Sequence, residues 1–559
     1  MNKLIDLTKI AGLALLGTAV ACGGAEKGTV PVNSPVPNHE VTQPAPDNSK
    51  PDTNKPELKT PTVTRMEPPI QNLEFPEEAF RAKQPKAGER RAFKLPRMKR
   101  FPVRGGIRAF LMEQHTLPTI SVSLVMPGGS VNDPKGKEGL ASVCMGLLSD
   151  GTKELDKIAL SEALADTASS VSSYAGRDEQ GLSMSTLTKH FDSTFKLFHA
   201  TLMTPGFRKD QFERSIKRRV ARLRQTKASA RSVSRRISGV VSNGPDHVLS
   251  RVTTVKSLRS LKVEDCVKYH ATWIKPRGAK LFVVGDMTRK NVRAKFGKGL
   301  NTWKGRAKRS ARITMPKPLA GRVFFVNIPG SAQSSITFLN RGPKRKARNH
   351  LHNSMAAAVL GGSFSARVNM NLREDKGYSY GARAGFRYNR KFGSFYAASA
   401  VRSDSTYQSV IELWNEIKNM RDGTKPATKS ELKRERNGAV LGLPGRFATA
   451  RGALGRYRGL IYHRLPLNYY NSYVAKLSRV TLAQVNRAAK RHFNLKKAQI
   501  LVVGDANAKI KVRKDGKDVP LMVDGKQVKL LDGLKMLLKS GKIGNGQLVI
   551  LDADGNIKN

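Results

Sequence analysis

The chain has 559 residues and 39% of them are hydrophobic, so it is long enough for about two to four domains with real cores. Its formal net charge of +57 favours anionic partners, although the basic residues are spread along the chain and also fit a solvated surface. The basic clusters at 214–224, 306–312 and 344–348 carry no interleaved aromatic residues, and no nucleic-acid-binding motif occurs, so a nucleic-acid partner is not expected.

Residues 1–22 resemble a bacterial lipoprotein signal. Lys3 and Lys9 give a positive start, the apolar run 10–20 is too short to span a bilayer comfortably, and small residues precede Cys22. The resemblance implies that Cys22 is lipidated and anchors the protein to a membrane of the bacterial cell envelope, on the periplasmic or outer membrane face. The alternative is an ordinary secretory signal with an incidental cysteine, and in either case the protein leaves the cytoplasm.

Residues 23–95 are rich in Pro, Asn, Thr, Lys and Glu and contain few apolar residues. Such a segment cannot bury enough surface to offset the entropy lost on ordering. We therefore expect a disordered, proline-rich tether between the anchor and the folded part, with prolines that favour extended conformations.

The first expected domain covers residues 96–303. It opens with apolar strands at 106–112 and 119–126, and a Gly-Gly turn follows at Gly128. A helix is expected at 137–148, and long helical stretches are expected from there to about residue 227. A basic segment with two prolines, 304–320, is the expected linker to a second domain.

The second expected domain covers residues 321–510 and has a similar order of elements. The patterns predict strands at 322–328, 334–340, 378–388 and 393–401, and helices at 348–360, 405–421 and 429–441. In both domains a helix pattern leads to a short apolar strand that ends in Gly-Asp, at 263–286 and again at 481–505. A repeat of that length predicts tandem homologous domains. We expect an α+β fold in which each domain is a mostly antiparallel sheet with helices packed on one side. Residues 511–559 are expected to form a tail outside this core.

One motif in the second domain is specific enough to indicate a family. The run Leu372-Arg-Glu-Asp-Lys-Gly-Tyr-Ser-Tyr380-Gly-Ala382, preceded by Leu360-Gly-Gly-Ser-Phe-Ser-Ala-Arg367, resembles the second-domain signature of insulinase/pitrilysin zinc peptidases. It is most similar to the paired bacterial members of that family. The resemblance covers about residues 100–510.

The zinc motif of this family is missing from the first domain. Active members carry H-x-x-E-H on the first helix, where two histidines on one helical face bind zinc and the glutamate acts as general base. Ser142, Met145 and Gly146 occupy those three positions here, and none can coordinate zinc or act as a base. The family's third ligand is a glutamate about 70–80 residues later, but residues 214–245 contain no acidic residue. We therefore expect no metal on this chain.

The remaining cysteines and histidines offer no substitute site. The three cysteines of the chain include no C-x-x-C pair, so neither a zinc knuckle nor a disulfide framework is indicated. Cys144 is expected to be a small buried hydrophobic residue. The histidines include no pair at H-x-x-x-H spacing.

The resemblance implies a role for Arg373 and Tyr380. In the family, these residues bind the substrate backbone and help to stabilise the oxyanion; the alternative is a structural Arg373 paired with Glu374 or Asp375 and a Tyr380 packed in a strand. The chain would then be a non-catalytic subunit that binds short unfolded peptides and supplies both residues to a zinc-bearing partner of the same family, inactive on its own. The main alternative is an envelope peptide-binding or scaffold lipoprotein with no role in proteolysis. A basic surface protein that holds acidic polymer or anionic membrane, and an autonomous peptidase with an unrecognised site, are further alternatives.

Overall fold

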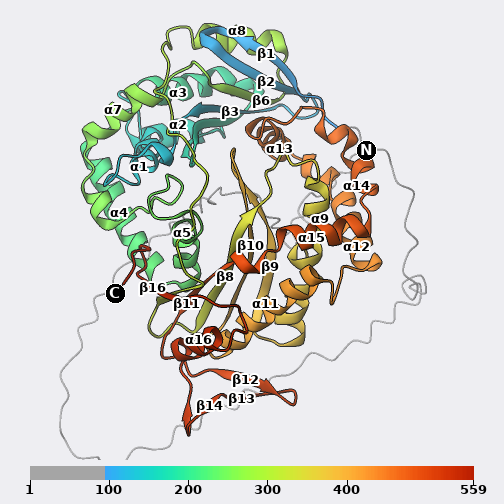
Figure 1. Cartoon of the computed structure of the whole chain (residues 1–559). Coiled ribbons are helices and arrows are strands. Elements are labelled where there is room, and N and C mark those ends of the chain that lie inside the picture. The colour runs from blue at the N-terminus through green and yellow to red at the C-terminus, as the bar shows by residue number, and fades with distance from the viewer. Residues whose placement is uncertain (1–94, 559) are drawn as a thin grey trace, which may run out of the picture. The chain divides into compact units, whose positions relative to one another are not determined.

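The first predicted domain is built on a six-stranded sheet in the computed structural model, which describes residues 95–558 (Figure 1). The strand order is β1-β2-β6-β3-β5-β4, in which β2 and β6 are parallel and the other neighbours are antiparallel. The strands are β1 (Lys99–Val103), β2 (Ile107–Glu113), β3 (Thr119–Pro127), β4 (Ser170–Ala175), β5 (Glu179–Leu187) and β6 (Lys280–Gly285). The predicted signal with Cys22 and the predicted tether up to residue 94 lie outside the described residues.

Helices of the same domain cover one face of this sheet. They are α1 (Leu140–Leu148), α2 (Lys157–Ala165), α3 (Phe191–Met203), α4 (Lys209–Lys227), α6 (Val255–Arg259), α7 (Val263–Trp273) and α8 (Arg289–Gly299). Alternate strand residues, such as Val122 and Leu124 of β3, face the helices because successive side chains of a strand point to opposite sides. The first hydrophobic core lies between the sheet and these helices.

The second domain repeats this arrangement around a sheet of order β16-β7-β11-β8-β10-β9. Its strands are β7 (Val323–Asn327), β8 (Gln333–Gly342), β9 (Ser379–Tyr388), β10 (Gly393–Arg402), β11 (Gln499–Gly504) and β16 (Leu548–Leu551). Its main helices are α9 (His350–Gly361), α11 (Thr406–Asp422), α12 (Lys429–Leu441), α14 (Tyr473–Ser478), α15 (Leu482–His492) and α16 (Leu530–Lys539). Both sheets are mostly antiparallel, so the predicted α+β fold with two homologous domains is confirmed.

The repeated Gly-Asp ends of β6 and β11 have a steric reason. Gly285 adopts a φ of 129°, and a Cβ at this position would lie 2.0 Å from the carbonyl oxygen of Thr119 in the neighbouring strand. A Cβ at Gly504 would lie 2.2 Å from the Ser334 hydroxyl. Both strands therefore end where the backbone approaches its neighbour too closely for any side chain.

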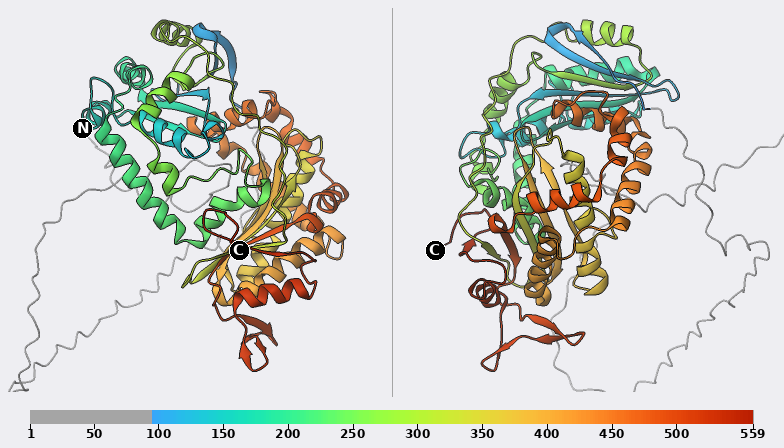
Figure 2. Two further views of the ribbon diagram at one scale, coloured as in Figure 1. Left: turned by 60° about the vertical axis from the view of Figure 1, so that its left-hand side comes forward. Right: turned by 45° about the vertical axis from the view of Figure 1, so that its right-hand side comes forward.

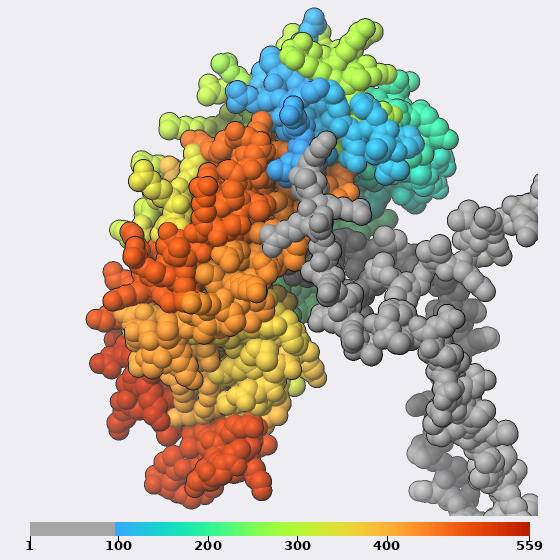
Figure 3. All heavy atoms as spheres, turned by 90° about the vertical axis from the view of Figure 1, so that its right-hand side faces the viewer, coloured from blue at the N-terminus to red at the C-terminus, as the bar shows by residue number. Residues whose placement is uncertain are grey.

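The two domains exchange one helix each. Helix α5 (Ala230–Asn243), which belongs to the first half of the sequence, packs through Val233, Ile237 and Val241 on the free face of the second sheet. Helix α13 (Ala450–Tyr462), which belongs to the second half, packs through Leu454 and Leu460 on the free face of the first sheet (Figure 2). Figure 3 shows the same contact from outside, with the orange C-terminal segment against the blue N-terminal strands. Each sheet is therefore covered on its second face by a helix of the other domain.

The expected long helical stretch up to residue 227 was wrong in part, because β4 and β5 interrupt it. Strand β4 reads Ser-Val-Ser-Ser-Tyr-Ala and is exposed or half-buried throughout. Strand β5 mixes Ser, Thr, Gly and Gln with its apolar residues. Small polar residues give a weak strand pattern, so the pairing of β5 with β3 decides this region.

Part of the segment expected to be a tail lies in the second domain. Helix α16 buries Leu530, Leu534 and Leu537 in the second core, and β16 adds a parallel strand beside β7. The Asp554 carboxylate beyond β16 pairs with Lys227 and Arg236 of the first half. Two short hairpins, β12–β13 (Lys511–Lys514, Lys517–Pro520) and β14–β15 (Met522–Val523, Lys526–Gln527), precede α16.

The expected linker, 304–320, contains no helix or strand. It follows α5 closely, since the backbone N–H of Leu319 donates to the Val241 carbonyl at 2.9 Å. Among residues 95–558 we find no helix with the length and apolar character needed to cross a membrane.

Candidate functional site

Helix α1 carries the three positions of the lost zinc motif, and Asp133 fixes its first turn. The Asp133 carboxylate accepts hydrogen bonds from the backbone N–H groups of Gly139 and Ala141, both at 2.9 Å. Burial raises the pKa of Asp133 to about 6, against the lowering effect of these two hydrogen bonds. The start of the helix is therefore held by a buried carboxyl group.

The three motif positions differ in exposure. Ser142 is exposed, Gly146 is half-buried, and Met145 lies fully buried in the first core with 0% exposure. The residue at the position of the general base has therefore become a packing residue. No polar group replaces it.

An arginine lies beside the other two positions. Arg219 of α4 donates from its Nη1 to the Ser142 hydroxyl and from its Nη2 to the Ser142 carbonyl, both at 2.9 Å. Its Nε donates to the Ser215 hydroxyl at 3.3 Å. A Cβ at Gly146 would lie 2.8 Å from Nη2, so the missing side chain leaves room for the guanidinium.

This arrangement does not fit a zinc ion. A guanidinium is always protonated and offers only donors, so it can neither coordinate a cation nor activate water. Across residues 95–558, no cluster of three or more His, Cys, Asp or Glu side chains could hold a metal ion. Glu213, the nearest carboxylate in the sequence, lies at an exposed position of α4. Sequence reasoning noted the missing acid but did not identify Arg219, whose only signal was the arginine-rich pattern of α4.

Cys144 is buried, as expected, but the sequence did not indicate the disulfide that it forms. It forms a disulfide with Cys266 of α7, with a Cα–Cα distance of 4.9 Å and a sequence separation of 122 residues. The pairing could not be deduced from spacing, because only the packing of α1 against α7 brings the two thiols together. The former zinc helix is thus covalently tied to its neighbour.

Arg373 and Tyr380 lie next to each other in the second domain. Arg373 belongs to a π-helical segment (Met370–Asp375), an irregular geometry that is frequent at functional sites. Its Nη1 donates to the Tyr380 carbonyl at 3.2 Å, its Nε pairs with Glu374 at 3.0 Å, and its guanidinium lies 4.7 Å from the centre of the Phe364 ring. The expected alternative, a pair with Glu374, is therefore also present.

The Tyr380 side chain is not packed in the strand, since it is 88% exposed. Phe364 is 55% exposed, and its ring lies beside the guanidinium. The pair therefore presents a cation, a phenol hydroxyl and aromatic surface to solvent. Such a set can donate hydrogen bonds to a carbonyl or an oxyanion.

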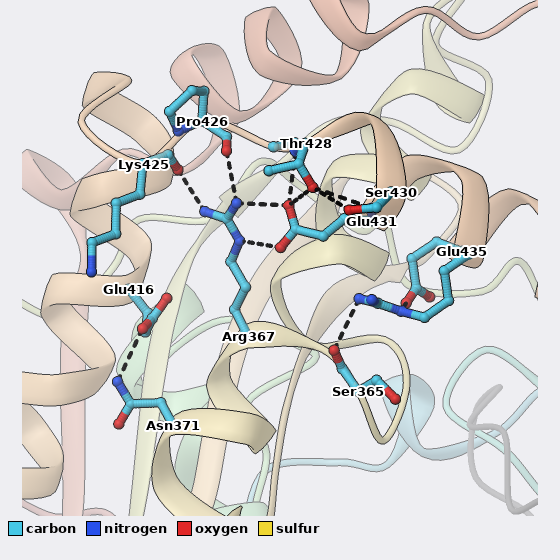
Figure 4. A network of polar contacts seen from close by, with 12 residues as sticks. Ser365, Arg367, Asn371, Glu416, Lys425, Pro426, Thr428, Ser430, Glu431 and Glu435 are labelled. Atoms are coloured by element: carbon cyan, nitrogen blue, oxygen red, sulfur yellow. Dashed lines mark hydrogen bonds and ion pairs between the residues drawn. The ribbon is translucent and has the colours of Figure 1, made fainter. Parts of the chain in front are cut away.

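A half-buried network of polar contacts holds the segment that carries Arg373 (Figure 4). Arg367 forms a bidentate pair with Glu431 of α12, at 2.6 and 2.7 Å, and donates to the carbonyl oxygens of Lys425 and Pro426. At the other end, the Asn371 amide donates to Glu416 of α11 at 3.0 Å. These residues position the segment, and sequence reasoning missed their role. The usable signal was the Thr428-x-x-Glu431 capping box, which is formed.

The zinc-motif positions and the Arg373–Tyr380 pair belong to different domains. Ser142 and Gly146 contact Arg219 of their own domain, whereas Arg373 contacts Phe364, Glu374 and Tyr380 of its own domain. The chain thus has one site that is closed by an arginine and a disulfide, and one that remains exposed.

Comparisons with known proteins indicate the family of the chain. The profile described as "Insulinase (Peptidase family M16)" matches residues 108–239, and "Peptidase M16 inactive domain" matches residues 260–439. The chain is similar to the "Non-peptidase homolog YmxG" of Helicobacter pylori, with 21% identity over 399 residues, 70% of this chain and 90% of that protein.

Solved structures share the fold. An M16 inactive-domain protein from Pseudomonas fluorescens superposes with a TM-score of 0.67 and 21% identity, over 73% of this chain and 98% of the other. A protease from Helicobacter pylori gives a TM-score of 0.65 and 15% identity, over 73% and 100%. The periplasmic protease PqqL from Escherichia coli gives 0.62 and 14%, over 76% and 47%.

The two profiles together span more than half of the chain, and the zinc ligands are replaced by Ser142, Gly146 and an arginine-rich α4. The chain therefore belongs to the insulinase-type peptidase family M16, as a non-catalytic member.

Proposed function

We propose that this protein is the peptide-binding, non-catalytic subunit of a two-subunit metallopeptidase and supplies Arg373 and Tyr380 to a zinc-bearing partner of the same family. The observation that carries the proposal is the contrast between the two sites. The zinc helix has acquired a buried Met145 and a disulfide, whereas the Arg373–Tyr380 pair keeps an exposed position on a held segment.

The chemistry assigned to each subunit follows from this contrast. The partner would hold the zinc, which supplies an activated water, since the part of this chain that the structure describes, 95–558, holds no residue set that could do so. Arg373 and Tyr380 would bind the peptide carbonyl and stabilise the charge that develops on its oxygen, because a guanidinium and a phenol hydroxyl both donate hydrogen bonds. Peptide binding by this chain alone is part of the proposal.

The proposal places the protein in the bacterial cell envelope, with Cys22 as the lipidated residue. The Cys144–Cys266 disulfide supports it, because disulfides persist mainly in oxidising compartments outside the cytoplasm. A Cys22→Ser variant is expected to appear in the soluble fraction instead of the membrane fraction, and its retention in the membrane would contradict the anchor.

The decisive experiment is peptide hydrolysis by the full chain with zinc, with and without a candidate zinc-motif partner. We expect cleavage only with the partner, and a reduction by roughly 100-fold in kcat for Arg373→Ala, since loss of one oxyanion donor costs about 10²–10³. Arg421→Ala serves as the matched control, because Arg421 also pairs with an adjacent acidic residue, Asp422, but lies at the end of α11.

Three outcomes would count against the proposal. Zinc-dependent cleavage by the chain alone would show an unrecognised catalytic site. Equal rates for Arg373→Ala and Arg421→Ala would remove the assigned role of the pair. Binding of peptides with no cleavage in any mixture would instead favour an envelope scaffold without a role in proteolysis.

A further inference from the structure

One end of the second sheet is left uncovered by the exchanged helix. Helix α5 packs over β7, β11 and β8, where Thr337 of β8 bonds Ser234 of α5 at 3.0 Å. Strands β10 and β9 lie beyond β8 in the same sheet, and β9 is its edge strand. On the side of the sheet that α5 covers, β10 and β9 therefore extend past α5 and have no covering helix of their own.

Three arginines lie on this uncovered face. Arg383 and Arg387 of β9 are four residues apart and so point to the same side of the sheet. Arg341 of β8 lies in the same row as Arg387, because both pair with Ser394 of β10. All three side chains are exposed, and none forms an ion pair with a carboxylate of residues 95–558.

A fourth arginine faces this row from the first domain. Arg177, in the turn between β4 and β5, is solvent-exposed, but surrounding protein and the nearby Arg387 lower its pKa. The carboxylates beside it, Asp178 and Glu179, are already engaged by Arg390 and Arg458.

The strand positions that share this face carry no acidic residue. Between the arginines, β9 contributes Gly385, and Tyr396 of β10 packs against it and under the Arg387 guanidinium at 4.3 Å. This face, called the arginine face below, thus combines three exposed arginines that pair with no carboxylate of residues 95–558 with the aromatic ring of Tyr396. Guanidinium groups in such a setting recognise carboxylates through paired hydrogen bonds.

We infer that this arginine face, formed by Arg341, Arg383 and Arg387, binds acidic segments of an extended peptide and gives the protein a preference for acidic peptides. The inference rests on the proposed peptide-binding function and adds the charge class of the ligand. An extended peptide is favoured over single-stranded nucleic acid, because Tyr396 is the only aromatic residue among the strand positions that share this face, and successive bases would need several rings to stack on.

The test measures binding of fluorescent twelve-residue peptides to the full chain by anisotropy. The three peptides differ only in carrying glutamate, glutamine or lysine at four positions. We expect the glutamate peptide to bind at least about tenfold more tightly than the glutamine peptide, as charged hydrogen bonds contribute about 1.5–3 kcal/mol each. The difference in affinity between the two peptides should shrink as salt is raised, because the three arginines are exposed to solvent.

The variant that tests the arginine face replaces both Arg383 and Arg387 by glutamine. The control variant replaces both Arg231 and Arg235 by glutamine. The control pair removes the same charge from exposed positions of α5. The β9 variant should lose the preference for glutamate while it still binds the glutamine peptide, and the control should keep the preference. Circular dichroism and the unfolding midpoint establish that both variants are folded, and lysine at both β9 positions should restore much of the preference.

Each other outcome overturns the inference in a distinguishable way. Equal binding of the three peptides by the wild type would leave peptide binding intact but remove the charge class. Absence of binding to any peptide would contradict the proposed function as well. If single-stranded DNA or phosphatidylglycerol vesicles bound more tightly than the glutamate peptide, and this binding were lost in the β9 variant, the arginine face would be assigned to another class of ligand.

Discussion

At the scale of single residues, the former zinc site is closed by small changes that depend on one another. Gly146 has no side chain, and this leaves space for the Arg219 guanidinium, which bonds both the hydroxyl and the carbonyl of Ser142. Restoring a histidine at position 146 alone would collide with Arg219. The packing between α1 and α4 therefore excludes a zinc ion, in addition to the residues that occupy the zinc-ligand positions.

Buried histidines make the stability of the protein depend on pH. Burial and the nearby Arg345 lower the pKa of His350 to about 3 and that of His463 to about 4. Unfolding lets these groups take up a proton below about pH 6.5, so the unfolded state binds more protons between that pH and the folded pKa. Stability is therefore expected to fall as the pH drops from 6.5 towards 4, by up to about 1.4 kcal/mol per pH unit for each histidine.

The pKa of Asp133, which is raised to about 6, acts in the opposite direction between about pH 4 and 6 and offsets part of this slope. Urea unfolding at pH 7.5, 6.5 and 5.5 measures the effect. His350→Gln should flatten the slope. A free energy of unfolding that is constant over this range would contradict the prediction.

At the scale of elements, helix α1 has changed from a catalytic to a structural element. Seven of its residues are buried, Asp133 holds its first turn, and the disulfide joins it to α7. The two cysteines are 122 residues apart in the sequence, and a cross-link over so long a loop removes much conformational freedom from the unfolded chain. The helix that once held zinc now contributes to stability.

Removing the disulfide is expected to lower the free energy of unfolding substantially. Cys144→Ala with Cys266→Ala should cost about 3–5 kcal/mol, measured by urea unfolding without reductant. Dithiothreitol should lower the unfolding midpoint of the wild type towards that of the variant and have no effect on the variant itself. Two alkylatable thiols at these positions in the native, unreduced protein would contradict the disulfide.

At the scale of the whole described unit, the two domains meet through the exchanged helices, through the pairs of Asp554 with Lys227 and Arg236, and through a second polar cluster. The turn between β4 and β5 provides Asp178 and Glu179, and the second domain provides Arg390 and Arg458. Tyr462 of α13 donates to Asp178 at 3.0 Å. Burial raises the pKa of Asp178, against the effect of Arg390, so each carboxylate depends on its partner across the interface.

Breaking this cluster should loosen the contact between the domains. Asp178→Asn with Glu179→Gln leaves two arginines without their anionic partners and should cost about 1–3 kcal/mol, less than a fully buried pair because the groups are partly exposed. Hydrogen exchange should become faster in the β4–β5 and β9–β10 turns. Asp532→Asn, which breaks the exposed pair with Lys535, is the control and should change stability by less than about 0.5 kcal/mol. Equal exchange in both variants would contradict the prediction.

The sequence by itself determined the tandem α+β repeat, most strand and helix positions, the missing zinc ligands and the Arg373–Tyr380 motif. These features depend on local periodicity and on residue identity at short spacing, which are readable along the chain. The bounds of β7, β8, β9 and β10 agree with the expected strands to within a few residues. The polar strands β4 and β5 were missed because they depend on pairing more than on their own composition.

Only the tertiary structure decided which distant residues meet. The Cys144–Cys266 disulfide, the placement of Arg219 over Ser142 and the exchange of α5 and α13 all join segments that are far apart in the sequence. The same holds for β16, which completes the second sheet from the segment expected to be a tail. Such contacts depend on how packed faces are oriented, and local sequence patterns carry no information on that orientation.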